Sequence, residues 1–102
     1  MVLINENIKE SIVMLKELLV NCIEEENIVC IHGKVCGYTI RYSSILDEFN
    51  IDYNELYLVC GWCEVHIKEN IVEITYDNEE NSVHIVSEKG ELYIDFNIDE
   101  KN

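Results

Sequence analysis

Residues 71–99, IVEITYDNEENSVHIVSEKGELYIDFNID, decide the fold of this chain. Three runs rich in Ile, Val, Tyr and Thr are separated by the polar clusters 78–81 and 88–91. Runs of this composition between polar clusters are typical of β-strands. Because the connections are short, we expect the three strands to form an antiparallel meander.

Apolar and polar residues alternate within these runs. In the last run, the apolar set is Leu92, Ile94, Phe96 and Ile98, and the polar set is Tyr93, Asp95, Asn97 and Asp99. In the first run, Val72, Ile74 and Tyr76 alternate with Glu73, Thr75 and Asp77. Clean alternation predicts a sheet with one face buried and the other in water.

The N-terminal quarter has the period of a helix instead. Apolar residues recur at steps of four and three, at Ile8, Ile12, Leu15, Leu19 and Cys22. This spacing predicts an amphipathic helix with one buried face. Asn7 and Glu10 have the spacing of a capping box, so we expect the helix to start there and to end at the run 24–27, EEEN.

The middle of the chain is less regular. Residues 27–42, NIVCIHGKVCGYTIRY, predict a hairpin that turns at Gly33 and Lys34. Residues 43–56, SSILDEFNIDYNEL, are an ambiguous connector that could hold single helical turns, and residues 56–67, LYLVCGWCEVHI, are one strand or two strands around a bulge. We therefore expect an α+β fold with a single domain over residues 1–102, in which the N-terminal helix packs on one face of a five- or six-stranded antiparallel meander.

The composition limits the classes of function. The net charge is −14 with a pI near 4.3, which repels nucleic acid phosphates and anionic membranes and favours a basic protein as partner. We find no signal peptide, and the longest apolar stretch is shorter than the ~20 residues of a bilayer span. Five cysteines cannot all pair within the chain, and we expect a cytoplasmic protein with free thiols.

The C-x-x-C formed by Cys60 and Cys63 has three interpretations. A redox pair is disfavoured because residues 64–76 read as strand, turn and strand, so no helix follows to lower a thiol pKa. A zinc site would combine Cys60 and Cys63 with ligands from the first hairpin, either Cys30 and Cys36 or His32 in place of one of them, and the C-x-H-x-x-x-C spacing of that group is loose. We favour the third interpretation, in which the cysteines are small buried apolar residues and the protein needs no metal or other cofactor.

The solvent-exposed face of the sheet is the predicted binding site. The residues assigned to it are Trp62, Glu64, Glu73, Asp77, Tyr93, Asp95 and Asp99. Carboxylates and aromatic rings on one surface suit the binding of a basic protein, although a merely hydrated face has the same pattern. No catalytic motif is present, and we expect a non-enzymatic inhibitor, of the immunity or anti-defence type, that masks a nuclease or another nucleic-acid-binding surface. The alternatives are a small zinc module and a subunit of a larger assembly.

Overall fold

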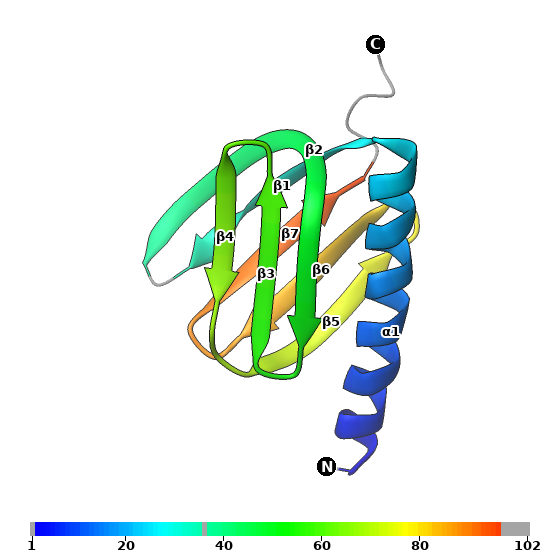
Figure 1. Cartoon of the computed structure of the whole chain (residues 1–102). Helices are drawn as coiled ribbons and strands as arrows, with labels where there is room; N and C mark the ends of the chain where they lie inside the picture. Colours follow the sequence, from blue (N-terminus) through cyan, green and yellow to red (C-terminus); the bar gives the residue numbers. More distant parts are fainter. Residues whose placement is uncertain (1, 36, 97–102) are drawn as a thin grey trace.

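The computed structural model of the chain describes residues 2–35 and 37–96, and the side chains from residue 8 onward (Figure 1). The described elements are α1 (Val2–Glu25), β1 (Ile28–Val35), β2 (Tyr38–Asp52), β3 (Glu55–Cys60), β4 (Cys63–Ile67), β5 (Ile71–Asp77), β6 (Ser82–Ser87) and β7 (Gly90–Asp95). The strands form one antiparallel sheet in the order β4-β3-β2-β1-β7-β6-β5. The predicted α+β class and the antiparallel pairing are confirmed.

The predicted number of five or six strands is wrong, because the described part of the chain forms seven. The connector 43–56 holds no helical turn: β2 runs through it to Asp52. A β-bulge between Leu46 and Glu48 shifts the register of β2 against β3. Inward residues are therefore even-numbered before the bulge and odd-numbered after it, which hides the strand from a search for simple alternation.

The first hairpin also turns later than predicted. β1 continues through Gly33 and Lys34 to Val35, and Gly37 (φ 83°) lies in the turn before Tyr38. Gly33 is opposite Leu92 in β7, and a Cβ on Gly33 would lie 2.2 Å from the backbone oxygen of Glu91. This glycine therefore serves the close approach of two strands and not a turn.

The long strand β2 belongs to two layers (Figure 1). Residues 46–52 of β2 pair with β3, which pairs with β4, and we call this the three-stranded layer. Residues 38–45 of β2 pair with β1, followed by β7, β6 and β5, and we call this the five-stranded layer. The core lies between the layers, and α1 closes one side by contacting β2 and β5.

The buried stripe of α1 matches the prediction. Ile8, Ile12, Leu15, Leu19 and Cys22 are all buried. The predicted start is wrong, because α1 begins at Val2 and passes through Asn7 without a break. The helix continues through Asn7 because residues 2–7 contain no proline or glycine, and asparagine inside a helix costs only about 0.7 kcal/mol or less.

The inward residues of β7 are Leu92, Ile94 and Phe96, all buried as the alternation predicts. Ile98 and Asp99 lie outside the described residues. In β5, Ile74 is buried but Val72 is 48% exposed, because a second bulge between Ile71 and Glu73 breaks the alternation there. Both bulges bend their strands, which helps the sheet to fold over its own core.

Candidate functional site

The outer face of the five-stranded layer has a row of rings across its strands. His32, Tyr93 and His84 are direct neighbours on β1, β7 and β6. The His32 and Tyr93 rings stack with centroids 5.1 Å apart, and the His84 and Tyr93 rings stack at 4.1 Å. Arg41 and Thr75 continue the row at its two ends. Stacking across adjacent strands stabilises a sheet, so this row has a structural role of its own.

Three carboxylates on this face already accept hydrogen bonds. His32 Nε2 donates to Asp95 Oδ2 at 3.1 Å, and His84 Nε2 donates to Glu91 Oε1 at 2.8 Å. Asp77 Oδ1 accepts the backbone N–H of Glu79 at 3.0 Å and that of Glu80 at 3.2 Å, which fixes the β5–β6 turn. The exposed cations Lys34 and Arg41 flank the same face, so its charge is mixed.

The outer face of the three-stranded layer is more uniformly acidic. Between Arg41 and Lys68 the chain contains five carboxylates and no Lys or Arg. Direct pairing aligns Glu48, Val59 and Glu64 in one row across β2, β3 and β4, and Asn50, Tyr57 and His66 in the next. We define the anionic face as Glu48, Asn50, Glu55, Tyr57, Glu64 and His66.

The contacts within the anionic face reflect its negative charge. Desolvation raises the pKa of the Tyr57 hydroxyl, and the neighbouring carboxylates of Glu64 and Glu48 raise it further. His66 Nε2 donates to Glu55 Oε2 at 2.7 Å, and the His66 ring meets that of Tyr57 edge to face at 5.0 Å. Glu48 and Glu64 have no cationic partner among the ion pairs of the described residues.

A tight hairpin presents Trp62 at the end of this layer. Cys60 and Cys63 are opposite each other, with Gly61 and Trp62 as the two turn residues. Gly61 has a φ of 62°, the conformation that a two-residue hairpin of this type needs at its first position. The Gly61 N–H donates to Asp47 Oδ2 at 2.9 Å, so the bulge residue of β2 anchors the turn. The Trp62 side chain is 98% exposed on this anchored turn.

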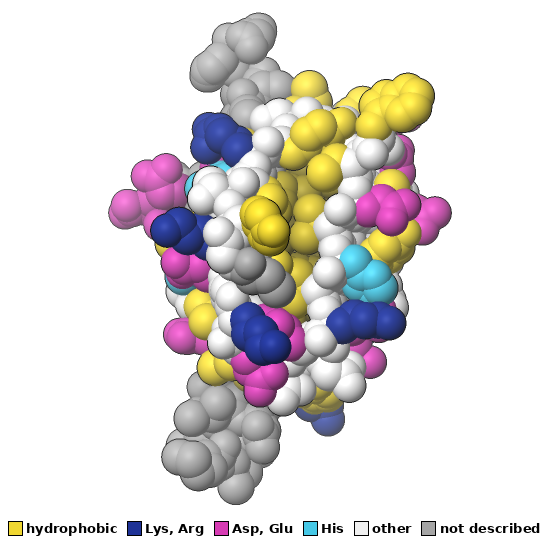
Figure 2. Space-filling model, turned by 90° about the vertical axis from the view of Figure 1, so that its left-hand side faces the viewer, with side chains coloured by type: hydrophobic (Ala, Val, Ile, Leu, Met, Phe, Trp, Pro, Cys, Tyr) yellow, Lys and Arg dark blue, Asp and Glu magenta, His cyan; other side chains and the backbone are white. Residues whose placement is uncertain are grey.

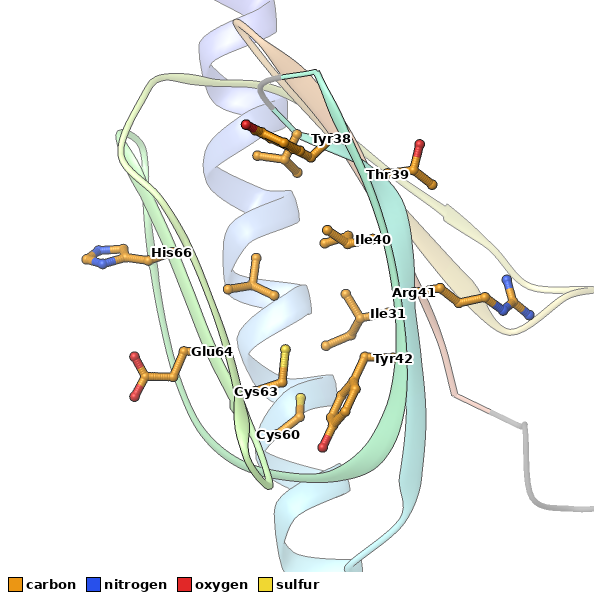
Figure 3. Close-up of a pocket in the computed structure, with 12 residues that line it drawn as sticks. Ile31, Tyr38, Thr39, Ile40, Arg41, Tyr42, Cys60, Cys63, Glu64 and His66 are labelled. Atoms are coloured by element: carbon orange, nitrogen blue, oxygen red, sulfur yellow. The ribbon is translucent and has the colours of Figure 1, made fainter.

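A groove of about 550 Å³ opens between the two layers on the side opposite α1 (Figure 2). Figure 2 shows its apolar floor as a yellow strip between paler ridges. Ile31, Ile40, Tyr42, Cys60 and Cys63 point into it (Figure 3). Glu64 and His66 line one rim and Thr39 and Arg41 the other, with side chains that point away from the interior (Figure 3). Among the described residues that line the groove, those that point inward are uncharged.

The Cys60 thiol at the base of the groove is held in its neutral form. Burial raises the pKa of Cys60 to about 11, and the charges of Cys63 and Asp47 act in the same direction. Burial, followed by the charge of Glu25, raises the pKa of Cys22 to about 11 as well. A nucleophilic or metal-binding cysteine needs a thiolate, so neither environment favours that chemistry.

The alternative zinc set is not brought together. Cys60 and Cys63 are neighbours beside the groove, whereas alternation along β1 points Cys30 away from the side on which Ile31 lines the groove. Cys36 lies outside the described residues. Within residues 2–35 and 37–96, no group of three or more His, Cys, Asp or Glu side chains is placed to hold a metal ion.

The structure divides the predicted site residues between two surfaces. Glu73, Asp77, Tyr93 and Asp95 share the outer face of the five-stranded layer, while Glu64 is on the three-stranded layer with Trp62 at its tip. They do not form one face, because β2 folds the sheet over and the outer sides of the layers point in opposite directions (Figure 1). Sequence reasoning missed Glu48, Tyr57 and the groove. The absence of Lys and Arg between residues 42 and 67 was the available signal for the first two.

No family model, no curated protein and no solved structure matches this chain. In the part of the chain that the structure describes, no helix has both the length and the apolar content needed to cross a bilayer.

Proposed function

We propose that this chain is a non-enzymatic protein-binding module whose anionic face, together with Trp62, captures the basic surface of a partner protein. The observation that carries the proposal is the segregation of charge: five carboxylates and no Lys or Arg between residues 42 and 67, which build the whole three-stranded layer. Of the faces described, this one differs most from the mixed charge of an ordinary hydrated surface.

The geometry supports two steps of binding, the electrostatic attraction of a basic partner and its anchoring by Trp62. A field of one sign steers an oppositely charged partner toward the face and speeds association. Trp62 then offers a large rigid side chain at the edge of that face, and buried tryptophans are among the most frequent anchors of protein interfaces. The Asp47–Gly61 hydrogen bond reduces the freedom of the turn before binding, which lowers the entropic cost of docking.

Basic protein surfaces often bind nucleic acid phosphates, so a partner of this kind would be masked by the anionic face. By this analogy of class, we propose an inhibitor of the immunity or anti-defence type that acts on a nuclease or another nucleic-acid-binding protein. Asp77, Tyr93 and Asp95 already contact other residues on the five-stranded layer, and Glu73 lies on that layer too, away from the anionic face. We therefore assign these four residues a supporting role at most.

The test is a pull-down from cells of the source organism, with the wild-type chain and Trp62→Ala as parallel baits and mass spectrometry as the readout. We expect a basic protein that the wild-type bait retains at low salt and releases at high salt, and that Trp62→Ala retains less. The purified partner should lose its binding to nucleic acid when the wild-type chain is added. A retained partner that is neutral or acidic, or whose retention ignores both salt and Trp62, would contradict the proposal.

A further inference from the structure

The groove lies between two strand edges that have no strand partner within the described residues. β4 pairs with β3 on one side only. Residues 38–44 of β2 pair with β1 alone, because pairing of β2 with β3 begins at Leu46. Free N–H and C=O groups along a strand edge are a template for a further strand. α1 contacts β2 and β5 at the opposite opening, so this opening is the one that the described elements leave uncovered (Figures 1 and 2).

The register of the hairpin indicates which backbone groups of β4 are free. A two-residue turn closes with a hydrogen-bonded pair, here Cys60 and Cys63. Hydrogen-bonded and non-hydrogen-bonded pairs then alternate along an antiparallel ladder. The backbone groups of Val65 consequently face β3, whereas those of Glu64 and His66 face the open edge.

The two sides of a strand added to β4 would meet opposite environments. On one side its side chains would enter the apolar groove beside Val65, Ile40 and Ile31. On the other side its side chains would lie beside Glu64 and His66 on the anionic face. Because successive side chains of a strand alternate between its faces, the complementary sequence is apolar at every second position and basic between.

We propose that the groove docks one extended segment of the partner protein, in which apolar residues alternate with Lys or Arg, and that this segment adds to the edge of β4 as a further strand. The inference rests on the proposed function, which supplies the basic character of the partner. An apolar small molecule would fit the floor of the groove but would leave the edge of β4 without a backbone partner.

The test uses the wild-type chain and two capped nine-residue peptides. The first alternates five lysines with four valines, and the second has the same residues with the valines in one block. We expect the alternating peptide to bind about tenfold more tightly, because only its valines can all enter the groove at once. NMR should show that the bound alternating peptide slows hydrogen exchange at the backbone amides of Glu64 and His66. The exchange rate of the Val65 amide, which is already paired with β3, should change little.

A matched pair of variants checks the groove itself. Tyr38 lines it and is 73% exposed, so Tyr38→Ala should keep the fold and weaken the alternating peptide about fivefold or more. Tyr53 is an exposed tyrosine that does not line the groove, and Tyr53→Ala should leave the affinity unchanged.

Several results would overturn strand addition. If both peptides bind equally and the double variant Glu48→Lys with Glu64→Lys loses this binding, strand addition is refuted. The proposed function would then still stand, because the anionic face would be binding positive charge without regard to its order. Binding of neither peptide would refute strand addition even if a basic partner is captured by the anionic face. Protection of Glu64 and His66 without peptide, with a mass that rises with concentration, would assign the edge to a second copy of the chain. Competition by decanoate without amide protection would assign the groove to a small apolar ligand.

Discussion

Glu26 ends α1 in a conformation that normally favours glycine. Its φ is 57°, its N–H donates to the Ile23 carbonyl at 3.2 Å, and the Asn27 N–H donates to the Cys22 carbonyl at 3.1 Å. These two bonds form the Schellman motif that closes many helices. A residue with a Cβ is strained at such a φ. The backbone groups at the end of the helix are therefore hydrogen-bonded, but the conformation of Glu26 is strained.

Glu26→Gly should therefore raise the free energy of unfolding by about 0.5–1 kcal/mol, since glycine adopts this φ without strain. The matched control is Glu24→Gly, which removes the same charge from a residue inside α1 and should lower stability by about 1 kcal/mol. Urea denaturation measures both. Stabilisation by both variants would mean that the relief of charge repulsion, and not backbone strain, is responsible.

Asp47 connects the bulge of β2 to the turn that carries Trp62. Its carboxylate accepts the Gly61 N–H at 2.9 Å, and a Cβ on Gly61 would lie 2.9 Å from Ser44 Oγ. The turn is thus held against β2 by one hydrogen bond, it lies close to Ser44, and its φ of 62° at Gly61 favours glycine. The Gly-Trp pair of the turn is plain in the sequence. Its hydrogen-bond acceptor, Asp47, fourteen residues earlier, is not, because the β-bulge that orients Asp47 toward the turn depends on tertiary contacts.

Asp47→Ala should leave the Gly61 N–H without its acceptor and lower stability by about 1 kcal/mol. The fluorescence anisotropy of Trp62, the single tryptophan of the chain, should fall as the turn loosens. Glu48→Ala removes a neighbouring carboxylate that makes no such bond and is the control. Unchanged anisotropy in Asp47→Ala would show that the turn holds its shape without this bond.

The buried thiols give stability a defined dependence on pH. Burial raises the pKa values of Cys22 and Cys60 from 9.0 to about 11, so the folded state keeps protons that the unfolded state releases. This contribution is complete below about pH 9 and is lost as the pH rises toward 11. We expect the free energy of unfolding to fall over that interval, and to fall less steeply in Cys22→Ala. An equal slope in the wild type and the variant would contradict the assignment.

At the level of elements, α1 and β7 follow their sequence patterns and β2 does not. The helical stripe and the alternation of Leu92 and Ile94 predict buried faces correctly, because each pattern is unbroken over the whole element. Because of the bulge of β2 at Asp47, the next inward side chain after Leu46 is Phe49 and not Glu48. This shift breaks the two-residue period on which the prediction depends. Irregular pairing with a neighbour is decided by tertiary contacts that local sequence does not encode.

The stripe of α1 supplies a direct comparison of two neighbouring residues. Leu19 is 0% exposed beneath the helix, while Val20 is 43% exposed on its outer side. Leu19→Ala should cost about 2–5 kcal/mol because it leaves a cavity in the core, whereas Val20→Ala should change stability by about 0.5 kcal/mol or less. Thermal or urea unfolding distinguishes the two. Similar costs at both positions would mean that a second surface covers the outer side of α1.

At the scale of the whole molecule, the decisive feature is that β2 folds one sheet into two layers. Alternation along each strand predicts which side chains share a side of the sheet, but it cannot reveal that the sheet bends between β1 and β3. A single wet face was therefore expected, and the molecule instead has two outer faces and an open groove between their edges (Figures 1 and 2). The distribution of charge then separates the faces: Lys34 and Arg41 accompany the carboxylates on one, whereas residues 42–67, which build the other, contain no Lys or Arg.

Charge reversal on the anionic face measures most directly whether that face binds the basic partner. Glu48→Lys with Glu64→Lys and the control Glu10→Lys with Glu17→Lys, on the exposed side of α1, each change the net charge from −14 to −10. Isothermal titration of the purified partner should show binding weakened by about 2–5 kcal/mol in the first variant and by much less in the control. Equal weakening in the two variants would show that only the overall charge matters, and would contradict the assignment of the anionic face as the site.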